Sequence, residues 1–93
     1  MPDHKEKVAI VTGGARGIGR GITDVLAENG ATICITDISK EHGNQAVMDL
    51  EAQGRKAIFI EADFSKSESL VRVVEECTNI LGKLDIIVNN VGI

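Results

Sequence analysis

Short apolar runs alternate along the chain with longer segments in which apolar residues recur every three or four positions. The apolar runs at residues 8–11, 32–36, 57–60 and 86–88 predict four strands. The segments between them have helical spacing and predict helices over 18–29, 40–53 and 65–81. A strand–helix repeat with short connections is typical of a parallel sheet covered by helices.

Glycine and serine residues mark the expected ends of these helices. Gly30 stands where a left-handed C-terminal cap belongs, and Gly54 and Gly82 end the second and third helices. Ser39 is the expected cap of the second helix, and Ser65-Lys66-Ser67-Glu68 has the spacing of a capping box. The apolar stripes expected to pack on the sheet contain Ile18, Ile22, Val25 and Leu26 in the first helix, and Leu70, Val71, Val74, Cys77 and Leu81 in the third.

The predicted fold class is α/β, a Rossmann-type parallel sheet with helices on both faces and strand order 3-2-1-4, ending after strand 4. In such a sheet the winding reverses between strands 1 and 4, and ligands bind at the carboxyl ends of the strands there. A glycine-rich loop, Asp37, Asp63 and Asn89-Asn90 follow the four strands in turn. We therefore expect these residues to meet at one edge of the sheet.

The loop after the first strand contains Gly13, Gly17 and Gly19 in a G-x-x-x-G-x-G pattern. Glycine allows positive φ angles and a close approach of the backbone to a ligand. The free N–H groups and the dipole of the following helix then face that ligand, which suits a pyrophosphate. No Lys-Ser/Thr pair follows the last glycine, so the loop is not a Walker A motif. Such a loop can also be no more than a tight crossover.

Asp37 at the end of the second strand predicts a preference for NAD. Its carboxylate can accept hydrogen bonds from both hydroxyls of an adenosine ribose and would repel a 2′-phosphate. Arg16 favours the opposite choice, because a cation beside Gly17 can pair with a 2′-phosphate. We expect the nearby carboxylate to outweigh an exposed arginine, with NADP as a second cofactor. An aspartate after a strand is also a common turn former or helix cap.

The residues after the third and fourth strands suggest further contacts. Asp63 can accept from an adenine amino group while the backbone beside it, at Phe64, meets a ring nitrogen; a plain loop acid remains an alternative. Amide side chains carry both a donor and an acceptor. One of Asn89 and Asn90 can therefore tie strand edges together while the other contacts a cofactor ribose, and Gly92 permits close approach of the backbone.

The segment Thr12-Gly13-Gly14-Ala15-Arg16-Gly17-Ile18-Gly19, together with Asp37, Asp63 and Asn89-Asn90-Val91-Gly92, resembles the short-chain dehydrogenase/reductase family. The resemblance runs from Lys7 to Ile93, and Val91 stands where the family usually has alanine. It implies an NAD(P)-dependent oxidoreductase acting on alcohols and carbonyls. The cofactor-binding residues that it implies are Gly13, Arg16, Gly17, Ile18, Gly19, Asp37, Ile38, Asp63, Phe64, Asn90 and Gly92.

The resemblance places the family's chemistry on a tyrosine acid/base, a lysine, a serine and a further asparagine beyond these four strands. The 93 residues contain no tyrosine, so no catalytic residue carries over and we expect no turnover by this chain alone. Residues 1–93 are expected to be the N-terminal part of a single dinucleotide-binding domain. A small alcohol or carbonyl substrate would then be bound only by a longer protein.

Composition excludes several partners. A net charge of −4 argues against a nucleic-acid surface. No apolar run approaches the roughly 18 residues of a membrane span, and the polar segment 1–7 is neither a signal peptide nor an anchor. A cytoplasmic location is expected.

Cys34 and Cys77 are expected to be buried apolar residues, not a disulfide or a metal pair, and no metal site is expected.

Two other functions stay open. One is a stand-alone module that binds NAD without turnover. The other is an interaction protein, a homo-oligomer in which copies cover the unpaired outer edge of the fourth strand. An S-adenosylmethionine site fits Asn89-Asn90 poorly. The abrupt end after the fourth strand favours a piece of a longer oxidoreductase.

Overall fold

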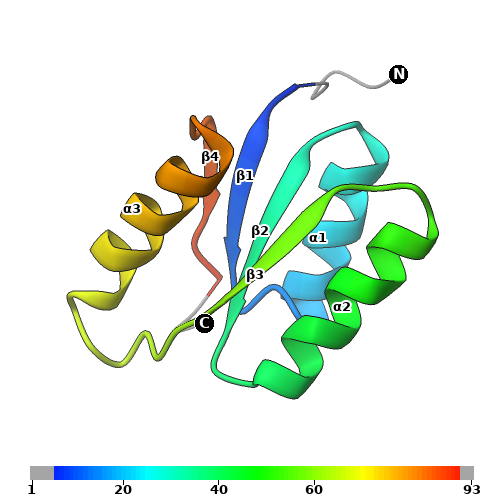
Figure 1. The fold of residues 1–93 in the computed structure, drawn as a ribbon. Coiled ribbons are helices and arrows are strands. Elements are labelled where there is room, and N and C mark those ends of the chain that lie inside the picture. Colours follow the sequence, from blue (N-terminus) through cyan, green and yellow to red (C-terminus); the bar gives the residue numbers. More distant parts are fainter. Residues whose placement is uncertain (1–5, 91–93) are drawn as a thin grey trace.

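The computed structural model describes residues 6–90, which form a four-stranded parallel sheet with helices on both faces (Figure 1). The strands run in the order β3-β2-β1-β4, and each pair of neighbours is parallel. The predicted fold class and strand order are therefore confirmed. The elements are β1 (Val8–Thr12), α1 (Gly17–Glu28), β2 (Thr32–Asp37), α2 (Lys40–Ala52), β3 (Ala57–Glu61), α3 (Ser69–Leu81) and β4 (Ile86–Val88).

The middle of β2, Ile33-Cys34-Ile35, is apolar because helices cover both faces of the sheet. Ile33 and Ile35 point into the core beneath α1 and α2, whereas Cys34 points into the core beneath α3. All three side chains are fully buried. A strand covered on both faces has no position for an exposed polar residue.

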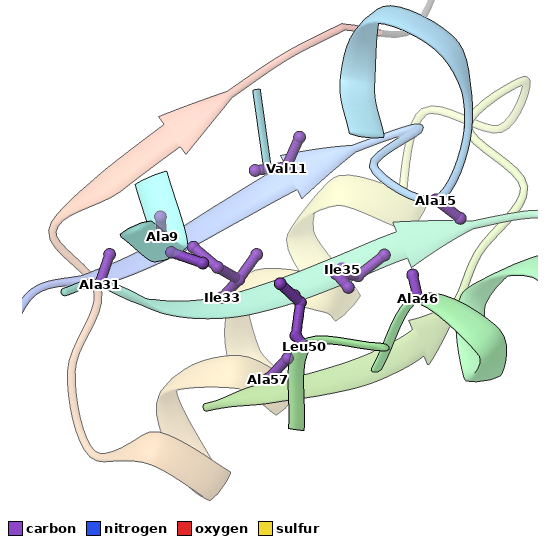
Figure 2. Packing of buried hydrophobic residues seen from close by; sticks show 10 residues of the cluster. Ala9, Val11, Ala15, Ala31, Ile33, Ile35, Ala46, Leu50 and Ala57 are labelled. Carbon is purple, nitrogen blue, oxygen red and sulfur yellow. The ribbon is translucent and has the colours of Figure 1, made fainter. Parts of the chain in front are cut away.

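The core beneath α1 and α2 combines large side chains from the sheet with small ones from the helices. Ala27 of α1 is buried there. Ala46 and Leu50 of α2 are buried beside it (Figure 2). Small residues let a helix axis approach the sheet closely, at the packing density of protein interiors. Figure 1 shows both helices lying over this one face, which leaves the other face to α3.

The predicted start of the third helix is wrong. α3 begins at Ser69, and its N-cap residue Glu68 makes no capping hydrogen bond through its side chain. The Ser65 N–H donates instead to Oδ1 of Asp63 at 3.0 Å, and the Ser69 hydroxyl donates to the Asp63 carbonyl at 2.6 Å. A local aspartate turn thus competes with the capping box for the same backbone group and prevails.

Two of the predicted apolar stripes are partly misplaced. Val71 is exposed, and Val73, which was not predicted, is buried. Cys77 is buried as predicted, and Val74 and Leu81 pack against the same core. In α1, Ile18 and Val25 are exposed. The fully buried residues of α1 are Gly19, Thr23 and Ala27, because small side chains fit where the helix approaches the strands closely. Ile22 and Leu26, as predicted, pack against the same core.

Other local predictions are confirmed. Ser39 caps α2 by accepting from the His42 N–H at 3.2 Å, and Gly30, Gly54 and Gly82 have positive φ angles just after the three helices. Both cysteines are buried and unpaired, and burial raises the pKa of the Cys34 and Cys77 thiols.

Within residues 6–90, no helix is long and apolar enough to cross a membrane.

Candidate functional site

A pocket of about 590 Å³ lies at the carboxyl edge of the sheet. It is formed where the chain leaves three neighbouring strands, as the parallel topology requires. Its lining consists of Gly13, Arg16, Asp37, Ile38, Ala62, Asp63, Phe64 and Ser65. Segments that follow β1, β2 and β3 therefore meet around one cavity.

The glycine loop leaves the start of α1 open. Gly13 and Gly17 have φ angles of 63° and 57°, which residues with a Cβ rarely adopt. α1 has no acidic residue in its first turn, and its N-cap residue Arg16 makes no capping hydrogen bond through its side chain. The first N–H groups and the positive end of the helix dipole are therefore available to an anion.

Gly19 serves a different purpose from the other two glycines. A Cβ at this position would overlap the carbonyl oxygen of Gly13 and lie 2.7 Å from Nδ2 of Asn90. The loop, the first turn of α1 and the segment after β4 are thus packed against each other through this residue. At Gly17, in contrast, a Cβ would find no atom within 4 Å, so the space above the loop is free.

Arg16 and Asp37 form an ion pair at the pocket wall. Nη2 of Arg16 lies 2.9 Å from Oδ1 of Asp37, and the two side chains are 50% and 4% exposed. The same Oδ1 accepts the Ser39 N–H at 3.0 Å. From the sequence, Arg16 and Asp37 are rival contacts for a cofactor; the structure shows that they also bind each other.

The turn after β2 is repeated after β3. Asp37-Ile38-Ser39 and Asp63-Phe64-Ser65 both place an apolar residue between an aspartate and a serine. In each, Oδ1 of the aspartate accepts the serine N–H at 3.0 Å. Hydrogen bonding from Ser65, by its side chain and its backbone, lowers the pKa of Asp63. Both aspartates thus form turns, which is the alternative role that the sequence suggested for Asp37. Both also line the pocket.

Thr12 joins β1 to the chain after β4. Its buried hydroxyl accepts the Asn90 N–H at 2.8 Å and lies 3.0 Å from Oδ1 of Asn89 and 3.3 Å from the Val88 carbonyl, to which it can donate. Asn89 is therefore the asparagine that ties the two strand edges together. The sequence patterns did not predict this role of Thr12. A polar residue at the end of a buried strand, directly before a glycine loop, could have indicated it.

The remaining predicted residues lie beside the pocket or outside the described part. Gly17, Gly19 and Asn90 border the loop without lining the cavity, and Ile18 is 71% exposed. Gly92 lies outside residues 6–90. Ala62 and Ser65 line the pocket without having been predicted, because nothing in their residue types distinguishes them from other loop positions.

A second hollow, of about 800 Å³, runs along α3 and shares Ile38, Ala62 and Asp63 with the pocket. Its acidic side chains outnumber its basic ones: Glu61, Asp63, Glu68, Glu75 and Glu76 against Lys66 and Arg72. This charge balance disfavours a phosphate. The anion-compatible part of the edge is the glycine loop.

Comparisons with known proteins agree with this geometry. The family model "short chain dehydrogenase" matches residues 7–93. L-2,3-butanediol dehydrogenase of Corynebacterium glutamicum is 39% identical over 89 residues, which cover 94% of this chain and 34% of that protein. The 3-oxoacyl-(acyl-carrier-protein) reductase of Chlamydia muridarum is 43% identical over 88 residues, covering 94% of this chain and 36% of that protein.

Two solved structures share the fold. A hydroxysteroid dehydrogenase from Escherichia coli superposes with a TM-score of 0.89 at 31% identity, covering 95% of this chain and 37% of that one. A blue fluorescent protein from a metagenomic library, solved in complex with NADPH, superposes with a TM-score of 0.89 at 43% identity. The match covers 96% of this chain and 37% of that one. The chain thus spans about a third of the length of the relatives it matches.

Proposed function

Because this chain belongs to the short-chain dehydrogenase family, we propose that it binds an adenine dinucleotide, NAD in preference to NADP, at the carboxyl edge of its sheet. The observation that carries the proposal is the glycine loop, held close to α1 at Gly19 and open above Gly17, beside a pocket that contains Asp37. The NADPH complex of a relative with 43% identity supports the same class of ligand.

The residues present fit such a cofactor. A pyrophosphate needs N–H donors and space at a helix N-terminus, and the start of α1 offers both. An adenosine ribose needs a hydrogen-bond acceptor, and Asp37 has its carboxylate in the pocket. Ile38 and Phe64, from the two aspartate turns, supply apolar surface for the adenine ring, and Asn90 is available for the second ribose.

We extend the proposal to the whole protein as an NAD(P)-dependent oxidoreductase of alcohols and carbonyls, working in the cytoplasm. A bound nicotinamide would supply the hydride or accept it. The residues of this chain hold and orient the cofactor, whereas the proton donor of the reaction belongs outside these 93 residues, which contain no tyrosine. The dehydrogenase and reductase names of the relatives support this reading.

Nucleotide titrations test the binding site. We expect AMP and NAD to bind the chain weakly, through the adenosine half, and Asp37→Ala to weaken both by at least about tenfold, because hydrogen bonds to a charged group contribute about 1.5–3 kcal/mol. Isothermal titration calorimetry with AMP, NAD and NADP measures this. Asp24→Ala is the matched control, since Asp24 pairs with Arg20 on α1 and does not line the pocket. Equal affinities of the unmutated chain for NAD and NADP would contradict the role of Asp37.

A second candidate function is association through β4. Within residues 6–90 this strand lies at the edge of the sheet with β1 as its neighbour. Ile87, the register partner of Ile10 on the α3 side, is 47% exposed, and Ile80 of α3 is 61% exposed. An unpaired strand edge beside exposed apolar side chains favours association. We propose that a second copy of this chain covers it.

Light scattering after size-exclusion chromatography tests the association. The apparent mass of the chain should rise with concentration, and Ile87→Lys should shift it toward that of the monomer because a charge at the contact must be desolvated. Met48→Lys is the control: Met48 is 62% exposed on α2, which packs on β2 and β3 far from β4 (Figure 1). A concentration-independent monomer for the unmutated chain would overturn the proposal.

A further inference from the structure

We infer that the Arg16–Asp37 ion pair selects between cofactors through two arrangements. The ion pair stays formed, or closed, when NAD binds, and a 2′-phosphate breaks it, which opens the pair. The inference rests on the proposed nucleotide site and adds to it a coupling between two residues that otherwise act separately. It starts from one contact, the 2.9 Å approach of Nη2 of Arg16 to Oδ1 of Asp37.

The closed pair leaves Asp37 able to accept from a ribose. Arg16 and the Ser39 N–H both contact Oδ1, and within residues 6–90 no hydrogen bond is made to Oδ2. Ribose hydroxyls can therefore donate to Oδ2 while the ion pair stays intact. NAD binding in this arrangement requires no rearrangement of Arg16.

A 2′-phosphate changes the balance of charges at the same place. The Arg16 side chain is half exposed, whereas Asp37 is almost completely buried at the end of β2. A phosphate would draw the guanidinium to itself by bidentate hydrogen bonds. The buried carboxylate would then lose its cation and face a second negative charge, so that part of what Arg16 gains from the phosphate is offset by the contact with Asp37 that it gives up.

This competition predicts that mutational effects are not additive. In the unmutated chain, the benefit of Arg16 to a 2′-phosphate is reduced by the broken ion pair. In an Asp37→Ala background Arg16 has no competing partner, and its full benefit appears. Arg16→Ala should therefore weaken binding of a 2′-phosphate more in the Asp37→Ala background than in the unmutated one, which is the signature of coupled residues in a double-mutant cycle.

The experiment measures the affinities of AMP and adenosine 2′,5′-bisphosphate for the unmutated chain, Arg16→Ala, Asp37→Ala and the double variant. These two probes differ only by the 2′-phosphate. We expect Arg16→Ala to change AMP affinity by less than about threefold, because the closed pair is not needed by the ribose. We expect its cost for the bisphosphate to be at least threefold larger when Asp37 is alanine. Thermal unfolding of each variant confirms that it is folded.

Arg20→Ala is the control, because it removes the same charge one turn away, in the first part of α1. Arg20 pairs with Asp24 and Asp49, away from the pocket lining, and its loss should leave the ratio of the two affinities unchanged. If Arg16→Ala costs the same in both backgrounds, or more in the unmutated one, the selector is overturned while the nucleotide site stands. If the unmutated chain binds neither probe, both the site and the selector fail.

Discussion

Replacing Gly19 by alanine is expected to abolish measurable nucleotide binding and to lower the free energy of unfolding by about 1–3 kcal/mol, the cost of overpacking a well-packed site. The new methyl group would overlap the Gly13 carbonyl oxygen and crowd Nδ2 of Asn90. The Asn90 side chain can rotate away, but the Gly13 carbonyl belongs to the backbone of the loop between β1 and α1 and cannot. The loop must shift, and the N–H groups that it presents shift with it.

Gly21→Ala is the matched control for this variant. Gly21 lies two residues further along α1 and is exposed, and a Cβ there would meet no atom within 4 Å. Alanine should stabilise the helix at this position by about 0.5–1 kcal/mol. Urea denaturation followed by circular dichroism and a titration with AMP compare the two variants. If Gly19→Ala were as stable as Gly21→Ala and bound AMP normally, the close packing at Gly19 would be wrong.

Thr12→Val and Thr36→Val are expected to change stability in opposite directions. The two threonines are register partners on β1 and β2, and both are fully buried. Thr12 accepts the Asn90 N–H and reaches Asn89, so valine would leave these groups without a partner, at a cost of about 1–3 kcal/mol. Oγ1 of Thr36 makes no hydrogen bond within the described residues, and its replacement by an apolar methyl group should stabilise the chain by about 1 kcal/mol.

The comparison separates a hydrogen-bonding role from simple burial. Valine has nearly the volume of threonine, so packing changes little in either variant, and each position is a control for the other. Urea denaturation gives the free energy of unfolding from the midpoint and the slope. Equal destabilisation by both substitutions would show that the Thr12 contacts with Asn89 and Asn90 add nothing to stability.

The helix faces and the start of α3 show what sequence patterns left undecided. Apolar spacing placed Ile18, Val25 and Val71 on inner faces, yet all three are exposed. Spacing identifies an apolar stripe but does not say how closely a helix approaches its sheet. Where the approach is close, small residues such as Gly19 and Ala27 occupy the contact. In the same way, the Asp63 turn took the N–H that a capping box at Ser65 would have used.

The candidate site was predicted in outline because the chain order constrains it. Parallel strands bring their carboxyl ends to one edge, so the loop at Gly13 and the aspartates after β2 and β3 had to meet once the strands were recognised. Their pairing was not predictable. Whether Arg16 contacts Asp37 depends on the path of a four-residue turn and on the tilt of α1, neither of which residue types specify.

The amino-acid sequence alone determined the order of strands and helices, the parallel sheet and the edge at which its polar residues gather, because these follow from hydrophobic periodicity and from the handedness of strand–helix–strand connections. Only the tertiary structure decided which helix faces are buried, where α3 begins, and that Arg16 and Asp37 bind each other while Thr12 holds the chain after β4. Those features depend on distances between elements far apart in sequence, which the packing of the whole sheet sets.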